Sequence, residues 1–211
     1  MCIRKSKFNG FTLVELIVAL MVTAIVLSAV VTLSYALSSA YESTSDIGEK
    51  QAGVRYTNLR ITELIRHSKL VCAWFYGDLV VWRADENGDN QINISEIVYI
   101  ETGYSNSYMR LLQFTPNEGN DWNISLSLVQ WPYLKNMLSS RYPQTSTTLV
   151  EKCNGMKIIL DKYPPYTHIV NIIYNIEEDD RVRTYQISAN LRCRASHLID
   201  TSNRLVSQDD D

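Results

Sequence analysis

The sequence has little of what most enzyme active sites use. Its three histidines, His67, His168 and His197, are isolated, and none has a cysteine or an acid at a ligand spacing that would be stronger than chance. It also lacks a glycine-rich phosphate loop, a nucleophile elbow and an HExxH motif. We therefore expect that the protein is not an enzyme.

An excess of positive charge is also absent. The 211 residues include 20 Lys and Arg against 23 Asp and Glu, which gives a formal net charge of −3. Such a chain is poorly suited to nonspecific contact with phosphate backbones, so bulk charge predicts no nucleic-acid partner. The length allows one hydrophobic core, or one core with a long accessory helix.

Cysteine is scarce, with four residues that include Cys2. The other three, Cys72, Cys153 and Cys193, are too far apart for a zinc site of the CxxC type. Outside the cytoplasm, one disulfide and one remaining thiol would be favoured. The sequence does not choose among the three possible pairings, and simple buried thiols are the alternative.

A long uncharged run dominates the first quarter of the chain. Residues 16–41 carry no formal charge, and as a helix they would be about 39 Å long at about 1.5 Å per residue. This exceeds the roughly 30 Å of hydrocarbon in a bilayer, so the run can span a membrane. Arg4, Lys5 and Lys7 precede it, which predicts that the N-terminal end stays on the cytoplasmic side.

The junction before this run carries the most specific pattern. Residues 7–16 read KFNGFTLVEL, with a basic residue, a Gly10-Phe11 junction and one acid, Glu15. This resembles the signal of type IV prepilins and type II secretion pseudopilins. The resemblance implies that a prepilin peptidase cleaves after Gly10 and methylates Phe11, and that Glu15 pairs with the new N-terminal ammonium during assembly. A glutamate at the interfacial end of an ordinary signal anchor is the alternative.

The same resemblance implies an organisation for the whole chain. Residues 1–10 would be a leader peptide, residues 11–41 a transmembrane and filament-core helix, and residues 42–211 an extracytoplasmic globular domain. Cleavage would remove Arg4, Lys5 and Lys7 and change the formal charge from −3 to −6. The implied partners are prepilin peptidase, other pilin or pseudopilin subunits, the inner-membrane assembly platform and membrane lipid. The implied location is the bacterial inner membrane, as a single-pass protein, and then a filament.

Beyond the membrane segment, the sequence predicts an α+β domain in which a long helix packs on an antiparallel sheet. Ile47, Val54, Ile61 and Ile65 share one helical face, so one helix is expected to reach about His67. A separate short helix after a linker at residues 43–45 is the alternative. A hairpin is expected at residues 70–83 with its turn at Gly77-Asp78, further strands at 96–101, 108–114, 122–129, 156–161, 168–176 and 182–192, a short helix at 132–140 and a loop at 139–148.

A second motif lies within the predicted sheet, where residues 85–96 read DENGDNQINISE. This spacing follows the twelve-residue EF-hand loop, and resembles the calcium loops of extracellular modules such as dockerins. Asn90 stands at the sixth position, where glycine is usual. We expect a structural calcium site; an Asx-rich loop that caps its own backbone is the alternative. The expected ligands are the side chains of Asp85, Asn87, Asp89, Asn93 and Glu96 and the carbonyl of Gln91.

Two other functional classes stay open at this level. A membrane-tethered, calcium-dependent binding or adhesion module would share the anchor without needing cleavage at Gly10. A tethered hydrolase would need a cleft lined by carboxylates with shifted pKa values. The sequence does not distinguish a major from a minor subunit, nor secretion, motility, adhesion and DNA uptake.

Overall fold

The computed structural model describes residues 12–103, 107–117, 119, 121–178, 181–193, 195–200 and 205, with the side chains of residues 42–47, 178 and 196 left out of the description. The chain forms two compact units, Met1–Gln51 and Ala52–Asp211. The expected cleavage site, Gly10 and Phe11, lies outside the described residues.

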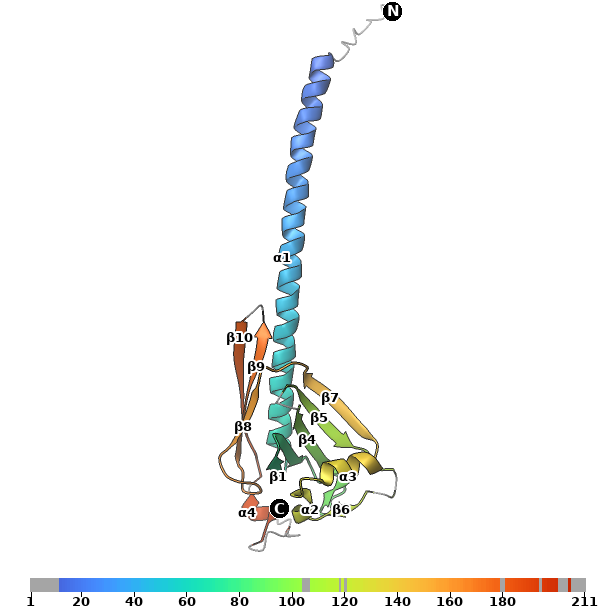
Figure 1. Cartoon of the computed structure of the whole chain (residues 1–211), viewed down its shortest axis with the longest axis vertical. Coiled ribbons are helices and arrows are strands. Elements are labelled where there is room, and N and C mark those ends of the chain that lie inside the picture. Colours follow the sequence, from blue (N-terminus) through green and yellow to red (C-terminus); the bar gives the residue numbers. More distant parts are fainter. Residues whose placement is uncertain are drawn as a thin grey trace, which may run out of the picture. The chain divides into compact units, whose positions relative to one another are not determined.

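The first structural element is one continuous helix, α1, which runs from Leu13 to His67 over 55 residues. No proline interrupts this stretch, so every turn after the first can keep its backbone hydrogen bonds. The expected long helix is confirmed, and the alternative of a separate short helix after a linker is wrong. Figure 1 shows α1 as an unbroken coil from the blue end of the described chain to the sheets.

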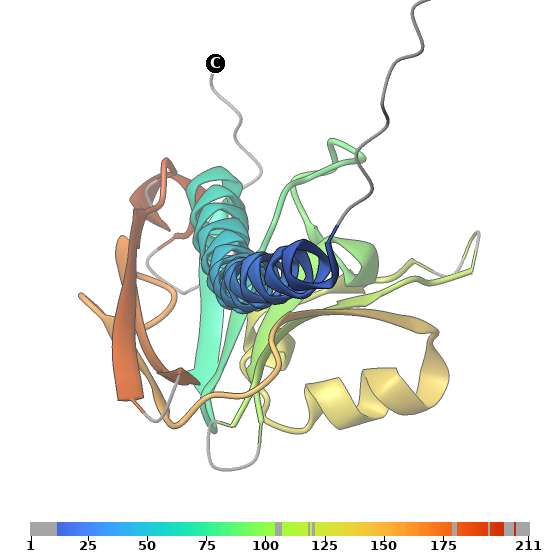
Figure 2. The same cartoon turned by 90° about the horizontal axis from the view of Figure 1, so that it is seen from above.

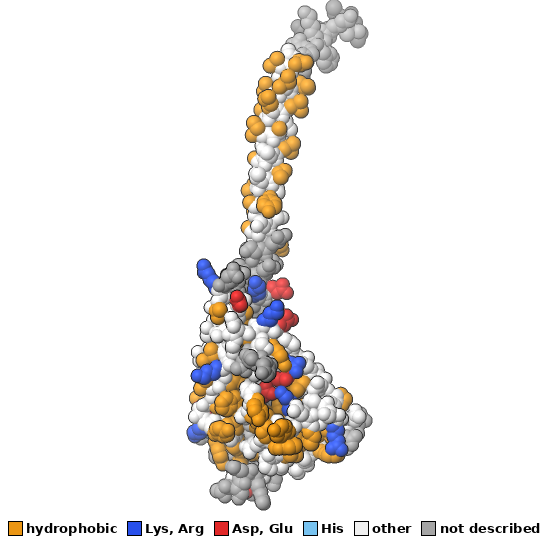
Figure 3. Space-filling model, viewed as in Figure 1, with side chains coloured by type: hydrophobic (Ala, Val, Ile, Leu, Met, Phe, Trp, Pro, Cys, Tyr) orange, Lys and Arg blue, Asp and Glu red, His pale blue; other side chains and the backbone are white. Residues whose placement is uncertain are grey.

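The N-terminal part of α1 is apolar on all sides. Leu13–Tyr41 is long and apolar enough to cross a membrane, with a mean hydropathy of 2.8, and none of it is buried within the structure. Figure 3 shows hydrophobic side chains all along this part of the helix. A helix that is hydrophobic all round needs an apolar environment, which a bilayer or neighbouring helices can supply.

The second unit contains the last turns of α1 and antiparallel sheets, so the expected α+β class is confirmed (Figure 1). The five-stranded sheet has the order β1-β2-β4-β5-β7, and its strands are Leu70–Phe75, Asp78–Trp82, Ile97–Thr102, Met109–Phe114 and Gln144–Val150. The three-stranded sheet has the order β10-β9-β8, with strands Arg181–Asn190, Ile169–Glu178 and Met156–Leu160. The remaining elements are β3 (Ile92–Asn93) paired with β6 (Asn123–Ile124), the 3-10 turn η1 (Ile94–Glu96), α2 (Leu126–Val129), α3 (Leu134–Arg141) and α4 (Ala195–Leu198).

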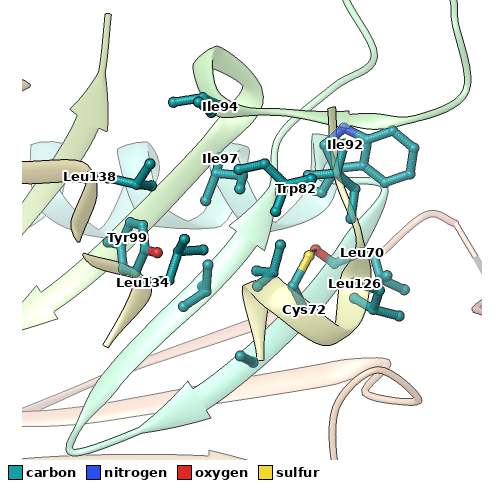
Figure 4. Close-up of a cluster of buried hydrophobic side chains, with 14 of the residues drawn as sticks. Leu70, Cys72, Trp82, Ile92, Ile94, Ile97, Tyr99, Leu126, Leu134 and Leu138 are labelled. Atoms are coloured by element: carbon teal, nitrogen blue, oxygen red, sulfur yellow. Dashed lines mark hydrogen bonds between the residues drawn. The ribbon is translucent and has the colours of Figure 1, made fainter. Parts of the chain in front are cut away.

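Both faces of the five-stranded sheet are covered, which explains why residues 79–82 of β2 and 97–100 of β4 are apolar at every position. Along β2, Leu79 and Val81 face one cluster of buried side chains, whereas Val80 and Trp82 face another. Successive side chains of a strand point to opposite faces, so a strand covered on both sides alternates between two cores. The first cluster adds α1 and the three-stranded sheet, and the second adds residues 92–94, α2 and α3, as Figure 4 shows for the second.

The end of α1 is anchored in the first of these clusters. Ile61 and Ile65 are fully buried there, as their spacing predicts. Two hydrogen bonds fix the helix to the sheets: Tyr174 OH donates to Asn58 Oδ1 at 2.9 Å, and Thr57 Oγ1 donates to the Leu149 carbonyl at 2.8 Å. Seen from above in Figure 2, these last turns lie beside the strands of both sheets.

Three local predictions differ from the structure. The hairpin turn is Tyr76-Gly77, since Phe75 pairs with Asp78, and both turn residues have positive φ angles of 51° and 87°. The expected strand at 122–129 is a two-residue strand followed by helix α2, whose N-cap Ser125 accepts a hydrogen bond from Leu128 N. The expected loop at 139–148 is wrong over most of its length: residues 139–141 belong to α3, and from Gln144 onwards β7 pairs with β5 along the edge of the sheet.

The three described cysteines are free thiols, so the expectation of one disulfide among them is wrong. Cys72 lies in the core beside Trp82 and Val80. Burial raises the pKa of the Cys72 thiol to about 12, because a thiolate would lose its hydration there. The alternative of a simple buried thiol therefore describes Cys72.

Candidate functional site

The N-terminus of α1 is closed by a reciprocal pair of hydrogen bonds between Thr12 and Glu15. The Glu15 carboxylate accepts from Thr12 N at 3.0 Å and from its hydroxyl at 2.9 Å, and Glu15 N donates to Thr12 Oγ1 at 3.3 Å. This is a capping box, in which a threonine and a glutamate three residues later satisfy each other's free amides. The Thr-x-x-Glu spacing indicates this capping box in the sequence, whereas the hydropathy of the apolar span does not.

This capping box bears on the predicted role of Glu15. Glu15 lies at the start of the Leu13–Tyr41 span, where a carboxylate without partners would be costly. Thr12 supplies two donors that reduce this cost. Phe11, whose amine the cleavage would create, directly precedes Thr12, so the new ammonium would arise on the residue next to the one that holds the Glu15 carboxylate.

The second candidate site, residues 85–96, lies between β2 and β4 and is closed across its ends. Arg83 N donates to the Glu96 carbonyl at 2.9 Å, and β3 within the loop pairs with β6 through Ile92 and Ile124. The side chains of Ile92 and Ile94 are buried in the same cluster as Trp82 (Figure 4). The loop is thereby fixed at the eighth and tenth of its twelve positions.

The turn in the first half of the loop has the backbone that the calcium-loop spacing requires. Asn90, at the sixth position, has φ +54°, and Gly88, at the fourth, has φ +72°. Asparagine tolerates this left-handed conformation better than most residues, so the departure from glycine does not prevent the turn.

Asp85, the first residue of the loop, points inward and is held by four donors. Its Oδ1 accepts from Gly88 N at 2.9 Å and from Asp89 N at 3.1 Å, and its Oδ2 accepts from Asn90 N at 2.9 Å and from Lys69 Nζ at 3.2 Å. Burial opposes ionisation of this carboxyl, but these donors, Lys69 foremost, outweigh it and hold the pKa of Asp85 below its usual range. The first residue is therefore an ionised, enclosed carboxylate.

Glu96, the twelfth residue, is buried and also fully engaged. Its Oε1 accepts from Glu86 N at 2.7 Å, and its Oε2 accepts from the Trp82 indole at 2.9 Å and from Asn93 N at 3.3 Å. These bonds tie the end of the loop to strand β2 and to the start of the loop. The twelfth residue is thus positioned by neutral donors alone among the described residues.

In the middle of the loop, Asn87 and Asp89 accept hydrogen bonds from the loop's own backbone, and Asn93 differs from them. Asn87 Oδ1 accepts from Asp89 N at 3.0 Å, and Asp89 Oδ1 accepts from Gln91 N at 2.8 Å, as in ordinary Asx turns. Asn93, at the ninth position, is 4% exposed and forms a capping box with Glu96 at the start of η1, but within the described parts of the chain its Oδ1 accepts no hydrogen bond of normal geometry. A buried oxygen without such a bond costs free energy, so an additional ligand there would stabilise the fold.

The structure brings the expected calcium ligands onto one short loop without joining their carboxylates at a common point. Among the described residues, no three His, Cys, Asp or Glu side chains form a group that could hold a metal. The donor set of three carboxylates, two amide oxygens and one carbonyl still suits a hard cation that takes six to eight oxygens. The carboxylates of Asp85 and Glu96 would have to exchange some of their present partners for the ion.

A buried ionic cluster, which the sequence reasoning missed, lies elsewhere in the second unit. Lys135 on α3 bonds to Asp78 on β2 and, at 3.3 Å, to Glu101 on β4, and Arg110 on β5 bonds to the other oxygen of Glu101. Burial raises the pKa of Asp78, whereas Arg110 and Lys135 overcome burial and lower the pKa of Glu101. No sequence spacing signals this cluster, because its members come from four elements.

The described surface also contains an open pocket of about 690 Å³ at one end of the three-stranded sheet. It is lined by Lys162, Tyr166, His168, Ile169, Asn190, Leu191 and Arg192. No carboxylate is among these side chains, so the pocket lacks the acid pair that a hydrolase of the kind considered above would need. It offers no support for the tethered-hydrolase alternative.

One comparison with known proteins finds a match, at the N-terminal pattern. A family model described as the prokaryotic N-terminal methylation motif matches residues 5–31. The match supports a type IV pilin-like chain, and the motif implies processing by a prepilin peptidase and assembly with other pilins. It does not reach residues 85–96. No curated protein and no solved structure matches the chain.

Proposed function

We propose that the protein is a non-enzymatic structural subunit, a minor pilin or pseudopilin, of a type IV pilus or a type II secretion filament. The observation that carries this proposal is the methylation motif at residues 5–31, which leads into a helix whose Leu13–Tyr41 part is apolar and exposed on all sides. A soluble protein would have no use for such a surface, whereas membrane storage followed by helix packing uses all of it.

The proposed cycle assigns each part of the N-terminus a task. The peptidase removes residues 1–10, and the helix stays in the bilayer with residues 42–211 outside the cytoplasm. During assembly Leu13–Tyr41 leaves lipid and packs with helices of neighbouring subunits. The Glu15 carboxylate, held by Thr12, then pairs with the Phe11 ammonium of its own or an adjacent subunit, because a charge pair inside an apolar filament costs less than either charge alone.

We expect the mature chain to begin at Phe11. Mass spectrometry of protein purified from membranes should find a chain shortened by residues 1–10 and one methyl group heavier than the unmodified remainder. A Gly10→Val variant should keep its leader, because a side chain at this position obstructs the cut. Gly48→Ala is the matched control, since a Cβ at this helical glycine meets no atom within 4 Å and should leave processing complete.

Other N-termini would contradict the proposal. An intact leader in the parent protein, or a cut after Tyr41, would make the chain an anchored or secreted protein instead. Equal processing of Gly10→Val and the parent would place the cleavage elsewhere.

We further propose that residues 85–96 bind a structural calcium ion through Asp85, Asn87, Asp89, Asn93 and Glu96 and the Gln91 carbonyl. The spacing, the left-handed Asn90 and the buried Asn93 oxygen, which accepts no hydrogen bond of normal geometry, support this. The ion would neutralise the carboxylates of Asp85, Asp89 and Glu96, and would stiffen the connection between β2 and β4. Sites of extracellular modules bind calcium at about 10⁻⁴–10⁻³ M.

Calcium is accordingly expected to stabilise the parent protein. At calcium about 100-fold above the Kd, the free energy of unfolding should rise by about 2.7 kcal/mol. Titration calorimetry of the full chain in detergent, after treatment with a chelator, measures the affinity. Asp89→Asn and Glu96→Gln should weaken binding, whereas Glu86→Gln, at the second, non-ligating position, should bind as the parent does. Absence of any binding heat, together with unchanged thermal stability, would remove calcium from the proposal.

A membrane-tethered binding module is the second candidate function. Exposed aromatic side chains favour it, notably Trp131 and Tyr133, whose rings lie 5.7 Å apart and edge-on. Aromatic side chains of this kind are common in binding surfaces. The N-terminal mass distinguishes the two candidates, because a tethered module does not require cleavage at Gly10.

A further inference from the structure

Lys69 is the residue that joins the end of α1 to the candidate calcium loop. It lies two residues after the last residue of α1, and its amide donates to the Trp82 carbonyl at 2.9 Å. Its side chain, 24% exposed, places Nζ 3.2 Å from Asp85 Oδ2 and 5.2 Å from the centre of the Trp82 ring. The ammonium is therefore held between the first loop residue and an aromatic face.

Lys69 pairs with Asp85, which is the more buried of the two loop carboxylates that form ion pairs, Asp85 and Glu86. The Asp85 side chain is 2% exposed. Asp85 is held by a cation, and removing one partner of a buried pair leaves the other charge uncompensated. Lys69 supplies this charge from within the chain.

The same lysine is linked to the other end of the loop through Trp82. The indole ring lies under the ammonium, and its Nε1 donates to Glu96 Oε2 at 2.9 Å. The first and twelfth positions of the loop are thus connected through two adjacent side chains, Lys69 and Trp82. A change at Asp85 that moves Lys69 would therefore alter the contact of its ammonium with the Trp82 ring, whose indole N–H positions Glu96.

A second cation near the loop provides a contrast. Within the described chain, the ion pairs made by residues 85–96 are those of Lys69 with Asp85 and of Arg83 with Glu86. Glu86 is at the second position, whose side chain is not a ligand in this loop type. Only the pair formed by Lys69 thus occupies an oxygen that calcium would need.

We propose that Lys69 is a built-in competitor of calcium, so that its ammonium and the divalent ion bind the Asp85 carboxylate in alternation. This inference rests on the proposed calcium site. Calcium at Asp85 repels the ammonium and releases Lys69 into solvent, which lowers the affinity of the site and limits its occupancy to calcium-rich surroundings. Because Lys69 follows α1, occupancy of the loop also changes a contact at the end of that helix.

The test is calcium titration of the full chain in detergent, by calorimetry, for the parent and three variants. Lys69→Met should bind calcium about tenfold more tightly, equivalent to about 1.4 kcal/mol, because the competing charge is gone. Lys69→Arg should bind calcium more weakly than Lys69→Met does, because a competing positive charge remains beside Asp85. Arg83→Met, which removes an equal charge from beside the loop, should change the affinity by less than about threefold, since exposed pairs are weak and screened.

The variants also separate this inference from the calcium site itself. If the parent binds calcium and Lys69→Met binds it with the same Kd, the competition is overturned and the site remains. The same conclusion follows if Arg83→Met gains as much affinity as Lys69→Met. No binding by the parent or by any variant would overturn both. Binding by Lys69→Met alone would support both, and Lys69→Gln repeats the measurement if the methionine variant does not fold.

Discussion

Replacing Lys135 by methionine should lower the free energy of unfolding at pH 7 by about 3–5 kcal/mol, the range seen when one partner of a buried ionic cluster is removed. Lys135 bridges Asp78 and Glu101, whose side chains are 6% and 10% exposed. Without it Asp78 loses its ammonium partner, while Glu101 keeps Arg110. Denaturant unfolding of the full chain in detergent measures the effect through tryptophan fluorescence. The four tryptophans, Trp74, Trp82, Trp122 and Trp131, all lie in the second unit.

The deficit of the Lys135→Met variant should depend on pH. Burial already raises the pKa of Asp78 in the parent, and loss of Lys135 raises it further. A carboxyl whose pKa is higher in the folded than in the unfolded state destabilises the fold above the folded value, and this penalty disappears as pH falls toward the unfolded value. The difference between variant and parent should therefore shrink between pH 7 and pH 4.

A matched lysine controls for the loss of charge. Lys157 on β8 is exposed, and Lys157→Met should change stability by no more than about 0.5 kcal/mol, as is usual for surface substitutions. If both variants lost equal stability, the cluster would have no special role. A deficit of Lys135→Met that grew as the pH fell would contradict the assigned charges.

The second large effect is expected at the C-terminal end of α1, where Ile65→Ala should cost about 2–5 kcal/mol. Ile65 is 0% exposed in the cluster that α1 shares with both larger sheets. Truncation removes three carbon atoms from a site that neighbouring strands cannot refill. The same fluorescence measurement of denaturant unfolding gives the value.

Leu59 on the same helix is the control, because it is 67% exposed. Leu59→Ala deletes as much apolar volume without opening a cavity, so its cost should stay below about 1 kcal/mol. Similar losses at the two positions would mean that the end of α1 does not pack as described. A small loss at Ile65 alone would place this residue outside the core.

Local patterns predicted the elements that depend on local physics. The spacing of Ile61 and Ile65 placed them on the buried face of α1, and the strands β9 and β10 follow from β-prone residues on either side of the acidic run at residues 177–180. The edge strand β7 was missed because Gln144–Val150 is mostly polar and exposed, and nothing but its pairing with β5 makes it a strand. The prediction of a strand at residues 122–129 was wrong because a local signal was overlooked: Ser125 caps a helix that begins within this range.

In the candidate calcium loop, too, some features depend on local sequence and others on the tertiary structure. The turn at Asn90 could be predicted from spacing, since an Asx-rich turn is a local structure. The calcium ligands that the same spacing predicts stay a prediction. The burial of the Asn93 oxygen and the bond from Trp82 to Glu96 could not be predicted from spacing, because they depend on which groups the sheet brings beside the loop. The described cysteines likewise differ from the expected disulfide, since the distances between them are decided by the fold.

The sequence by itself determined the N-terminal methylation motif, the apolar span Leu13–Tyr41 and the long helix, because charge, hydropathy and helical periodicity act over a few turns of chain. Tertiary structure alone decided the two-sided core of the five-stranded sheet, the ionic cluster around Lys135 and the contact between Lys69 and Asp85. These join residues that lie far apart along the chain, and their energies exist only once strand pairing has buried the groups together and removed the water between them.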